Sequence, residues 1–310
     1  MNGRDGHRGA SRRGISERAW GALFAGPALF LVGLLALAPL LGAVWLSFHR
    51  RLPIFGISEF AGARNYWLLW GDERFWAACR TTLHFTGLSV AAELFLGLGL
   101  ALLLDRVLNG RAAEARWVQA AVLIPWAVPT VVSAQMWSWL YHPDYGLLNY
   151  LLQATGLVSS PINWLDDPVR ALHAAVLMDV WKTTPFAALL LLAGLKTIPR
   201  DLYLAARADG AGRWAVFRHL TLPLLLPVIL IVLVFRTMDA VRIFDAVYVL
   251  TGGGPGNGTE TLSIYAYKTL FQTLQFGYGS TLATAMFLVV LALTAGYLLL
   301  LRRHLREIAS

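Results

Sequence analysis

Long apolar runs are the feature of this sequence that most restricts its fold. A helix needs about 20 apolar residues to cross the roughly 30 Å hydrocarbon core of a bilayer. Six stretches reach this length, at about 20–48, 76–104, 117–140, 169–195, 220–250 and 280–301. We therefore expect an all-α, multi-pass membrane protein with six transmembrane helices.

The composition supports a membrane protein and excludes two other classes. Hydrophobic residues make up 57% of the 310 residues and charged residues only 14%, whereas a soluble domain has about 25% charged residues. This excludes a soluble enzyme, and the high hydrophobicity excludes a disordered chain. The net charge of +8 does not require nucleic acid, since Lys and Arg collect in the loops of inner-membrane proteins. We expect lipid contact and no nucleic-acid partner.

The distribution of Lys and Arg predicts the orientation. With the N-terminus in the cytoplasm, sixteen of these residues fall in inside segments and five in outside segments. This bias places both termini in the cytoplasm. Residues 1–19 are rich in Gly, Arg and Ser and are expected to form a flexible tail, followed by a transmembrane domain over residues 20–310. A cleaved signal peptide is the alternative for the first span, but its apolar run continues to Phe48, which favours an uncleaved anchor.

The inside loop at residues 198–223 has helical signals but no span. Pro199 and Asp201 are typical of a helix start, and Gly210 and Gly212 interrupt the pattern. A second short helix is expected over 214–220, ending before a proline. Each helix has one apolar side, which by itself suits either a groove in another protein or a lipid surface.

The same loop resembles a known motif. Ala205-Ala206-x-x-x-Gly210, followed by Leu220-x-Leu222-Pro223, resembles the EAA loop of ABC-importer permeases. In that family the loop is a coupling helix that docks in a cleft of the ATPase subunit. The resemblance implies that the coupling residues are Ala205, Ala206, Asp209, Gly210, Leu222 and Pro223. The family's leading glutamate is replaced here by Leu204, so the contacts of that acid must be lost or supplied by neighbouring charges.

Other segments narrow the resemblance to sugar importers. Gly62-x-x-Asn65-Tyr66 and Thr251-x-Gly253-Gly254-Pro255 resemble permeases of the maltose and glycerol-phosphate type. Segments 180–195 and 235–253 are similar to the first permease of actinobacterial trehalose importers. The resemblance implies the type I importer fold in a bacterial inner membrane, and trehalose as substrate. Another disaccharide, an oligosaccharide and glycerol phosphate are the alternatives.

The resemblance also implies partners. These are a second permease that completes a heterodimer, two ATPase subunits that bind ATP and Mg²⁺, and an extracytoplasmic sugar-binding protein or lipoprotein. The sequence has no phosphate-binding loop of the G-x-x-x-x-G-K-[ST] type and no C-x-x-C or H-E-x-x-H metal motif. We expect no cofactor, metal site or catalytic residue in this chain. A membrane-embedded enzyme is the competing hypothesis from another class.

Charged residues inside the spans are candidates for function, because each costs about 2.5–3.5 kcal/mol at mid-bilayer. They are either structural ion pairs or the polar wall of a translocation cavity. Arg236, Asp239, Arg242 and Asp245 lie three apart and alternate in sign, so each has a neighbour of opposite charge if the helix is continuous. Glu93 is expected inside the bundle or in gating. The resemblance places the substrate contacts at Asp179, Lys182, Thr183, Phe186, Arg236, Asp239 and Ala240.

Overall fold

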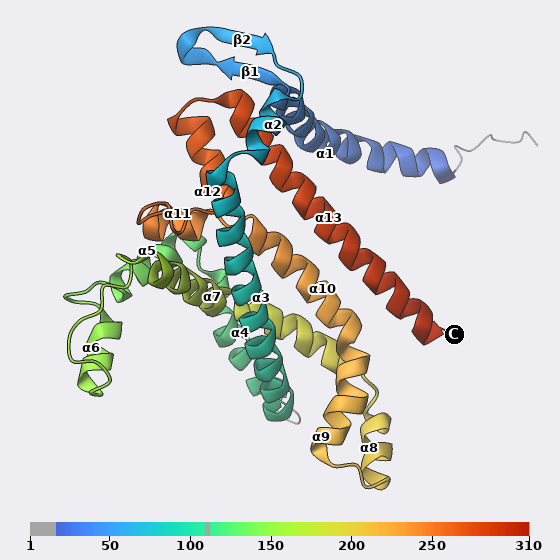
Figure 1. Cartoon of the computed structure of the whole chain (residues 1–310). Helices are drawn as coiled ribbons and strands as arrows, with labels where there is room; N and C mark the ends of the chain where they lie inside the picture. The colour runs from blue at the N-terminus through green and yellow to red at the C-terminus, as the bar shows by residue number, and fades with distance from the viewer. Residues whose placement is uncertain (1–16, 109–111, 310) are drawn as a thin grey trace, which may run out of the picture.

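The computed structural model describes residues 17–108 and 112–309, and over these ranges the chain is mostly helical (Figure 1). Residues 1–16 of the expected tail lie outside the described residues, and the first helix already begins at Glu17. The longer helices are α1 (Glu17–Ser47), α3 (Glu73–Leu108), α4 (Ala112–Ala127), α5 (Thr130–Leu140), α7 (Pro168–Thr197), α10 (Leu222–Val241) and α13 (Phe276–Ala309).

Shorter elements connect these helices. They are β1 (His49–Leu52), η1 (Pro53–Phe55), β2 (Ile57–Phe60), α2 (Arg64–Trp70), α6 (Leu147–Ala154), α8 (Arg200–Ala208), α9 (Arg213–Val216), η2 (Phe217–Thr221), α11 (Asp245–Thr251), α12 (Leu262–Tyr267) and η3 (Lys268–Gln272). Figure 1 shows the hairpin, α2 and α12 at one end of the molecule, the hairpin end, and α8 and α9 at the other, the loop end.

The membrane-spanning character expected from the sequence is confirmed. Among the described residues, five helices are long and apolar enough to cross a bilayer: Leu23–Ser47, Glu73–Val107, Pro168–Thr197, Arg213–Val241 and Phe276–Leu300. A sixth span is obtained when α4 and α5 are counted together. The described part of the chain therefore has five or six candidate spans.

The third expected span is not one straight helix. The helices of 117–140 meet at an angle of 84°, at a break after Ala127. Pro129 stands at the N-cap of α5, and proline has no backbone N–H for the helix and clashes with the carbonyl four residues earlier. The prediction of a continuous span over 117–140 is therefore wrong in geometry, although both halves are helical.

The fifth expected span differs at both ends. The helix that was expected to end before Pro223 continues through it, because the wider turns of η2 join α9 to α10 and Leu222 N–H donates to the Phe217 carbonyl. Pro223 then lies in the first turn of α10, where proline is tolerated. At the other end α10 stops at Val241 rather than 250, and Asp245 begins the separate helix α11.

A small antiparallel hairpin corrects the all-α expectation. β1 pairs with β2 in the register His49↔Phe60 to Leu52↔Ile57. Buried Asn65 explains the Gly62-x-x-Asn65 motif, since its Nδ2 donates to the carbonyls of Ser47 (2.8 Å) and His49 (3.0 Å). The hairpin is thereby tied to the end of α1, a role that the sequence pattern alone does not reveal.

The core of the bundle lies where α3 packs against α7 over most of its length. Gly97 allows the close approach, because a Cβ there would stand 3.2 Å from the Ala187 Cβ and 3.4 Å from the Ala188 nitrogen. α10 packs against both helices. By contrast, α1 extends away from the central helices (Figure 1) and contacts mainly α13 and β1. Its apolar side chains are exposed.

A polar cluster at the hairpin end connects residues 72–74 with residues 260–278. We call this cluster the hairpin-end clamp; its members are Asp72, Arg74, Glu260, Tyr265, Lys268 and Tyr278. Buried Glu260 accepts from Arg74 Nε (2.7 Å) and forms an ion pair with Lys268 Nζ (2.9 Å). Burial alone would raise the pKa of Glu260, but hydrogen bonds from Arg74 and Lys268 outweigh it, so the pKa lies below its usual value.

Asp72 is the second acid of the clamp. It accepts hydrogen bonds from the Tyr265 hydroxyl (2.6 Å) and the Tyr278 hydroxyl. Burial opposes ionisation of Asp72, yet these hydrogen bonds and two from backbone N–H groups lower its pKa. The clamp therefore connects α12 and α13 to the start of α3 and to the turn before it, through two carboxylates that are held in the charged form.

Candidate functional site

A cluster of ionisable side chains lies where α3, α7 and α10 meet. We call it the charge cluster; its members are Glu93, Asp179, Lys182, Arg236, Asp239 and Arg242. It contains three carboxylates and three cations, so its formal charges balance. Such balance offsets the cost of placing charges away from water, provided that each group also has a hydrogen-bond partner.

Arg236 on α10 is the centre of the charge cluster. Its guanidinium is 4% exposed and binds the fully buried Glu93 on α3 through two bonds, from Nε and from Nη2 (2.8 Å). Nη2 also contacts Asp179 Oδ2 on α7 at 3.2 Å. Thr183 Oγ1 donates to Glu93 Oε1 at 2.6 Å. One arginine therefore connects all three central helices.

The outer part of the charge cluster is open. Asp239 has a side chain that is 62% exposed, and its two oxygens lie 3.4 Å from Arg236 Nη1 and 3.4 Å from Arg242 Nη2. The alternating pairs expected along this segment are confirmed for these three residues. Asp245 does not extend the series, because α10 has already ended. Ala240, the neighbour of Asp239, is instead buried in the hydrophobic core.

Lys182 uses the break between α4 and α5. Its Nζ donates to the Trp126 carbonyl (3.1 Å), one of the carbonyls at the end of α4, where a cation is favourable. The Trp126 ring stacks on Phe186, with centroids 5.2 Å apart and planes within 12°. Trp126 was not singled out from the sequence; Pro129 three positions later was the available signal, because a break there frees the preceding carbonyls.

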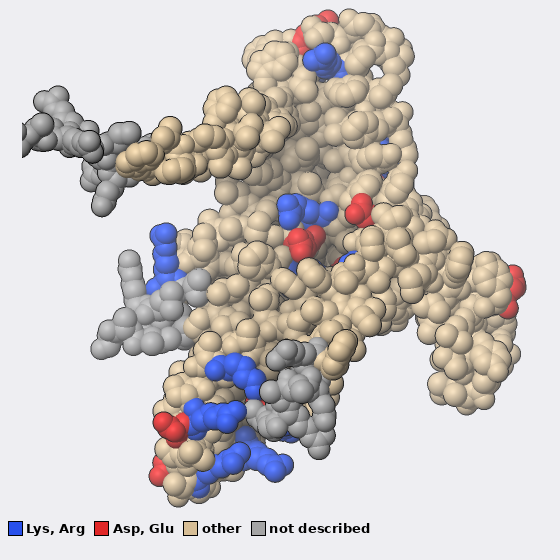
Figure 2. All heavy atoms as spheres, turned by 180° about the vertical axis from the view of Figure 1, so that it is seen from behind, with Lys and Arg blue, Asp and Glu red and all other residues tan. Residues whose placement is uncertain are grey.

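The arrangement combines the exposed Asp239 carboxylate with a stacked aromatic pair, in which Trp126 is exposed and Phe186 is half-buried. Carboxylates and guanidinium groups accept from and donate to hydroxyls, and aromatic faces pack against apolar C–H surfaces. Figure 2 shows a small group of acidic and basic side chains at mid-height on one face, surrounded by uncharged surface. An inner part of the charge cluster therefore forms buried ion pairs, and an outer part is accessible.

The loop at 198–223 forms a helical hairpin at the loop end. α8 contains no buried residue, and the large apolar side chains of Leu202, Leu204 and Trp214 are 41%, 61% and 69% exposed. Gly210 adopts φ +77° at the turn, and a Cβ there would meet no atom within 4 Å. The glycine is therefore required by the backbone conformation and not by packing within this chain.

The remaining coupling candidates lie on the same helical hairpin. Ala205 and Asp209 are exposed, and Ala206 is half-buried. Leu222 and Pro223 belong to the first turn of α10, which directly follows η2 in the chain. Basic side chains also gather over this end in Figure 2. The helical hairpin thus presents exposed apolar side chains and basic side chains at its surface.

Comparison with known proteins gives the class. Residues 94–307 match the family described as binding-protein-dependent transport system inner membrane component. This match covers more than half of the chain, so the protein belongs to that family. It is a multi-pass inner-membrane permease component and not an enzyme, and the family has no cofactor of its own. The resemblance drawn from the sequence is confirmed at this level.

Individual relatives are similar over almost the whole chain. The trehalose/maltose transport system permease protein MalF of Thermococcus litoralis is 44% identical over 91% of this chain and 93% of its own. The sulfoquinovosyl glycerol transport system permease protein SmoG of Agrobacterium fabrum is 39% identical over 93% and 92%. The trehalose transport system permease protein SugA of Mycobacterium tuberculosis is 39% identical over 88% and 85%.

Solved structures give the same fold. A crystal structure of a bacterial ABC transporter involved in the import of the acidic polysaccharide alginate aligns with a TM-score of 0.79 and 24% identity, over 93% of this chain and 96% of that one. The alginate transporter in complex with its pentasaccharide-bound periplasmic protein gives 0.76 and 23%, over 91% and 93%. The bent third span is therefore part of a fold that closely matches a known permease fold.

Proposed function

We propose that this chain is one of two permeases in an ABC importer for a sugar, and that the sugar is trehalose. The observation that supports trehalose as the substrate is what the relatives transport: two of the three named above are trehalose or trehalose/maltose permeases by name, at 39% and 44% identity. The third transports a sulfonated sugar derivative, so the shared class is a polyhydroxylated solute. Maltose, an oligosaccharide and glycerol phosphate are the competing substrates.

The proposed contacts divide into two layers. Asp239, Phe186 and Lys182 form the layer that touches the sugar, with Trp126 extending the aromatic surface. Asp179, Thr183, Arg236 and Ala240 form the layer behind it, which fixes the positions of the first. Burial supports the place of Asp239, whose side chain is 62% exposed, and of the second layer, which is 8% exposed or less. Lys182 is also only 8% exposed, and it is assigned to the first layer because its Nζ donates to the carbonyl of the exposed Trp126.

The proposed complex supplies what this chain lacks. A second permease completes the translocation path, two ATPase subunits bind ATP and Mg²⁺, and an extracytoplasmic binding protein delivers the sugar. ATP-driven closure of the ATPases moves the loop at 198–223, and the permeases expose the path to one side of the membrane at a time. The sugar is moved without any change of covalent bonds. The exposed apolar side chains of α8 and α9 support docking in an ATPase groove rather than in this chain.

The proposed orientation places the loop end and both termini in the cytoplasm, and the hairpin end outside. A tail at 1–19 and a transmembrane domain at 20–310 complete this topology. Fusions of green fluorescent protein and of alkaline phosphatase to the C-terminus test it. Fluorescence with no phosphatase activity is expected; phosphatase activity at the C-terminus contradicts the cytoplasmic placement of this terminus.

Reconstitution tests the substrate. The chain, its sister permease, the ATPase and the binding protein are placed in proteoliposomes, and uptake of labelled trehalose is measured with ATP inside the compartment that corresponds to the cytoplasm. Trehalose is expected to stimulate ATP hydrolysis and to be transported in preference to maltose, sulfoquinovosyl glycerol and glycerol phosphate. Preference for another of these solutes would refute trehalose but leave the importer proposal intact. No uptake of any solute by an assembled complex would refute the importer.

A further inference from the structure

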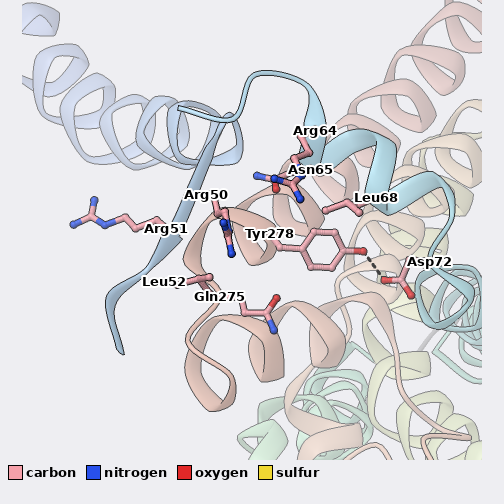
Figure 3. Close-up of a pocket in the computed structure, with 9 residues that line it drawn as sticks. All are labelled: Arg50, Arg51, Leu52, Arg64, Asn65, Leu68, Asp72, Gln275 and Tyr278. Carbon is pink, nitrogen blue, oxygen red and sulfur yellow. Dashed lines mark hydrogen bonds between the residues drawn. The ribbon is translucent and has the colours of Figure 1, made fainter. Parts of the chain in front are cut away.

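A pocket of about 330 Å³ opens at the hairpin end, between β1, α2 and the start of α13. Figure 3 shows its lining, which is Arg50, Arg51, Leu52, Arg64, Asn65, Leu68, Asp72, Gln275 and Tyr278. Its walls are fixed by packing, because a Cβ at Gly277 would fall 1.9 Å from the His49 carbonyl oxygen. The charge cluster and the loop at 198–223 contribute nothing to this pocket.

The pocket carries an excess of positive charge. Arg50 and Arg64 approach each other near Asn65 and the Tyr278 ring, whereas Arg51 extends away from them (Figure 3). The acid in the lining, Asp72, already accepts hydrogen bonds from Tyr265 and Tyr278. Glu59 is the cross-strand neighbour of Arg50 in the hairpin register, yet the described residues include no ion pair within 4 Å for Arg50, Arg51 or Arg64.

Two free guanidinium groups beside a cavity favour a phosphate group as ligand. The planar fork of arginine fits the oxygens of a phosphate in pairs and binds them more strongly than a neutral donor does. Asn65 does not compete for the ligand, since its Nδ2 is used by the carbonyls of Ser47 and His49. The cavity also has the apolar side chains of Leu52 and Leu68 in its wall, which suit a phosphate that carries an organic chain.

The depth of the pocket identifies the source of the phosphate. It lies directly beyond the apolar stretches of α1 and α13, which end at Ser47 and begin at Phe276. Trp45, Trp67 and Trp70 surround this level with exposures of 58%, 77% and 72%. Exposed tryptophans mark the layer of lipid headgroups, and Leu68 continues this apolar rim with 54% exposure.

We infer that the pocket binds the phosphodiester of an anionic phospholipid, with Arg50 and Arg64 as its ligands. The site goes beyond the proposed transport function and depends neither on the sugar nor on which side of the membrane the hairpin end faces. A bound headgroup would join β1, which directly follows α1, to α2.

Lipid binding by the purified complex tests the site. The complex is placed in nanodiscs of phosphatidylcholine with increasing phosphatidylglycerol, and retained phosphatidylglycerol is counted by native mass spectrometry. The variant Arg50→Gln/Arg64→Gln is expected to bind phosphatidylglycerol about 30-fold more weakly, because each cation near the headgroups contributes about fivefold. The matched control Arg80→Gln/Arg170→Gln removes the same charge at two exposed positions outside the pocket lining, and it is expected to bind like the parent.

Further arms separate the alternatives. Inorganic phosphate is titrated against the retained lipid; binding of phosphate with no displacement of phosphatidylglycerol overturns the lipid assignment. Equal retention of phosphatidylglycerol by the Arg50→Gln/Arg64→Gln variant and the control overturns the site. A third result would also overturn the site. In it, Arg50→Gln/Arg64→Gln retains as much phosphatidylglycerol as the parent but loses binding-protein-stimulated ATP hydrolysis in nanodiscs of pure phosphatidylcholine, which would assign the two arginines to a carboxylate of a partner protein. If the glutamine variant does not assemble, Arg50→Lys/Arg64→Lys keeps the charge without the fork, and undiminished lipid retention by it equally overturns the proposal.

Discussion

Arg236 on α10 binds Glu93 on α3 through two parallel hydrogen bonds, across 143 positions of sequence. Neither side chain is accessible, since Glu93 is fully buried and Arg236 is 4% exposed. A buried charge is tolerated when it is paired and hydrogen-bonded. Removal of one member is strongly destabilising, because the other charge is then buried without a partner. The pair therefore fixes α3 against α10 whether or not a substrate is present.

Removing the Glu93 carboxylate should disrupt the bundle rather than transport alone. Glu93→Ala leaves Arg236 with its weaker contacts to Asp179 and Asp239, and we expect a loss of about 3–5 kcal/mol, as for other broken buried pairs. The apparent melting temperature and the yield of assembled complex measure this effect. Glu59→Ala, at an exposed hairpin position without an ion pair, is the control. A Glu93→Ala complex of parental stability would contradict the structural role.

Asp239→Ala should have the opposite profile. The side chain is exposed and its two contacts are long, at 3.4 Å each, and exposed ion pairs contribute only about 0–1 kcal/mol. We expect assembly and melting temperature to stay near the parental values, while sugar uptake falls at least about tenfold, the equivalent of 1.4 kcal/mol of lost binding. Uptake and complex yield are measured on the same preparations. Failure of assembly with this variant would show that Asp239 is also structural.

The sequence predicts the existence of the spans well, because twenty consecutive apolar residues have few other uses. It predicts their shapes less well. Pro129 ends one helix, yet Pro223 does not, because η2 runs directly into α10 and Pro223 lies in the first turn of α10, where proline is tolerated. A proline pattern alone does not distinguish these cases. The hairpin at 49–60 was also missed, since four-residue strands have little periodicity to detect.

The charge cluster shows the same limit. Spacing along 236–245 correctly paired Arg236 and Arg242 with Asp239, because these three share one helix. Spacing does not reveal contacts between helices, so the stronger pairing of Arg236 with Glu93 was absent from the sequence argument. The small residues Ser89 and Gly97, four positions before and after Glu93, allow close helix packing and predict only that Glu93 faces inward, which its burial confirms.

Gly210 should be sensitive to any side chain, unlike its neighbour Gly212. Gly210 holds φ +77°, where an L-residue costs about 1–2 kcal/mol, whereas Gly212 has φ −70° and an extended ψ. Neither position is crowded within the chain. We expect Gly210→Val to assemble and insert but to lose coupling, so that ATP hydrolysis no longer responds to sugar and uptake falls. Gly212→Val should transport normally. Normal uptake by the Gly210 variant would refute the coupling role of this turn.

The hairpin-end clamp should make stability depend on acid. Because hydrogen bonds from Arg74 and Lys268 hold the pKa of Glu260 below its usual value of 4.5, its contribution is present above that value and is lost as the pH falls through the lower folded pKa. Asp72, whose usual value is 3.8, adds to the loss in the same direction. We therefore expect the apparent melting temperature to be level from about pH 7 to pH 5 and to drop below about pH 4.

Glu260→Gln separates the clamp from general acid effects. The variant should lose about 1–2 kcal/mol at neutral pH, at the lower end for hydrogen bonds to charged groups because Arg74 is partly exposed. Its melting temperature should then depend less steeply on pH between about pH 5 and pH 3 than that of the parent. Glu59→Gln removes an exposed carboxylate from the adjacent hairpin and should leave the acid profile unchanged. A Glu260→Gln profile parallel to the parental curve would mean that the acid sensitivity originates outside the clamp.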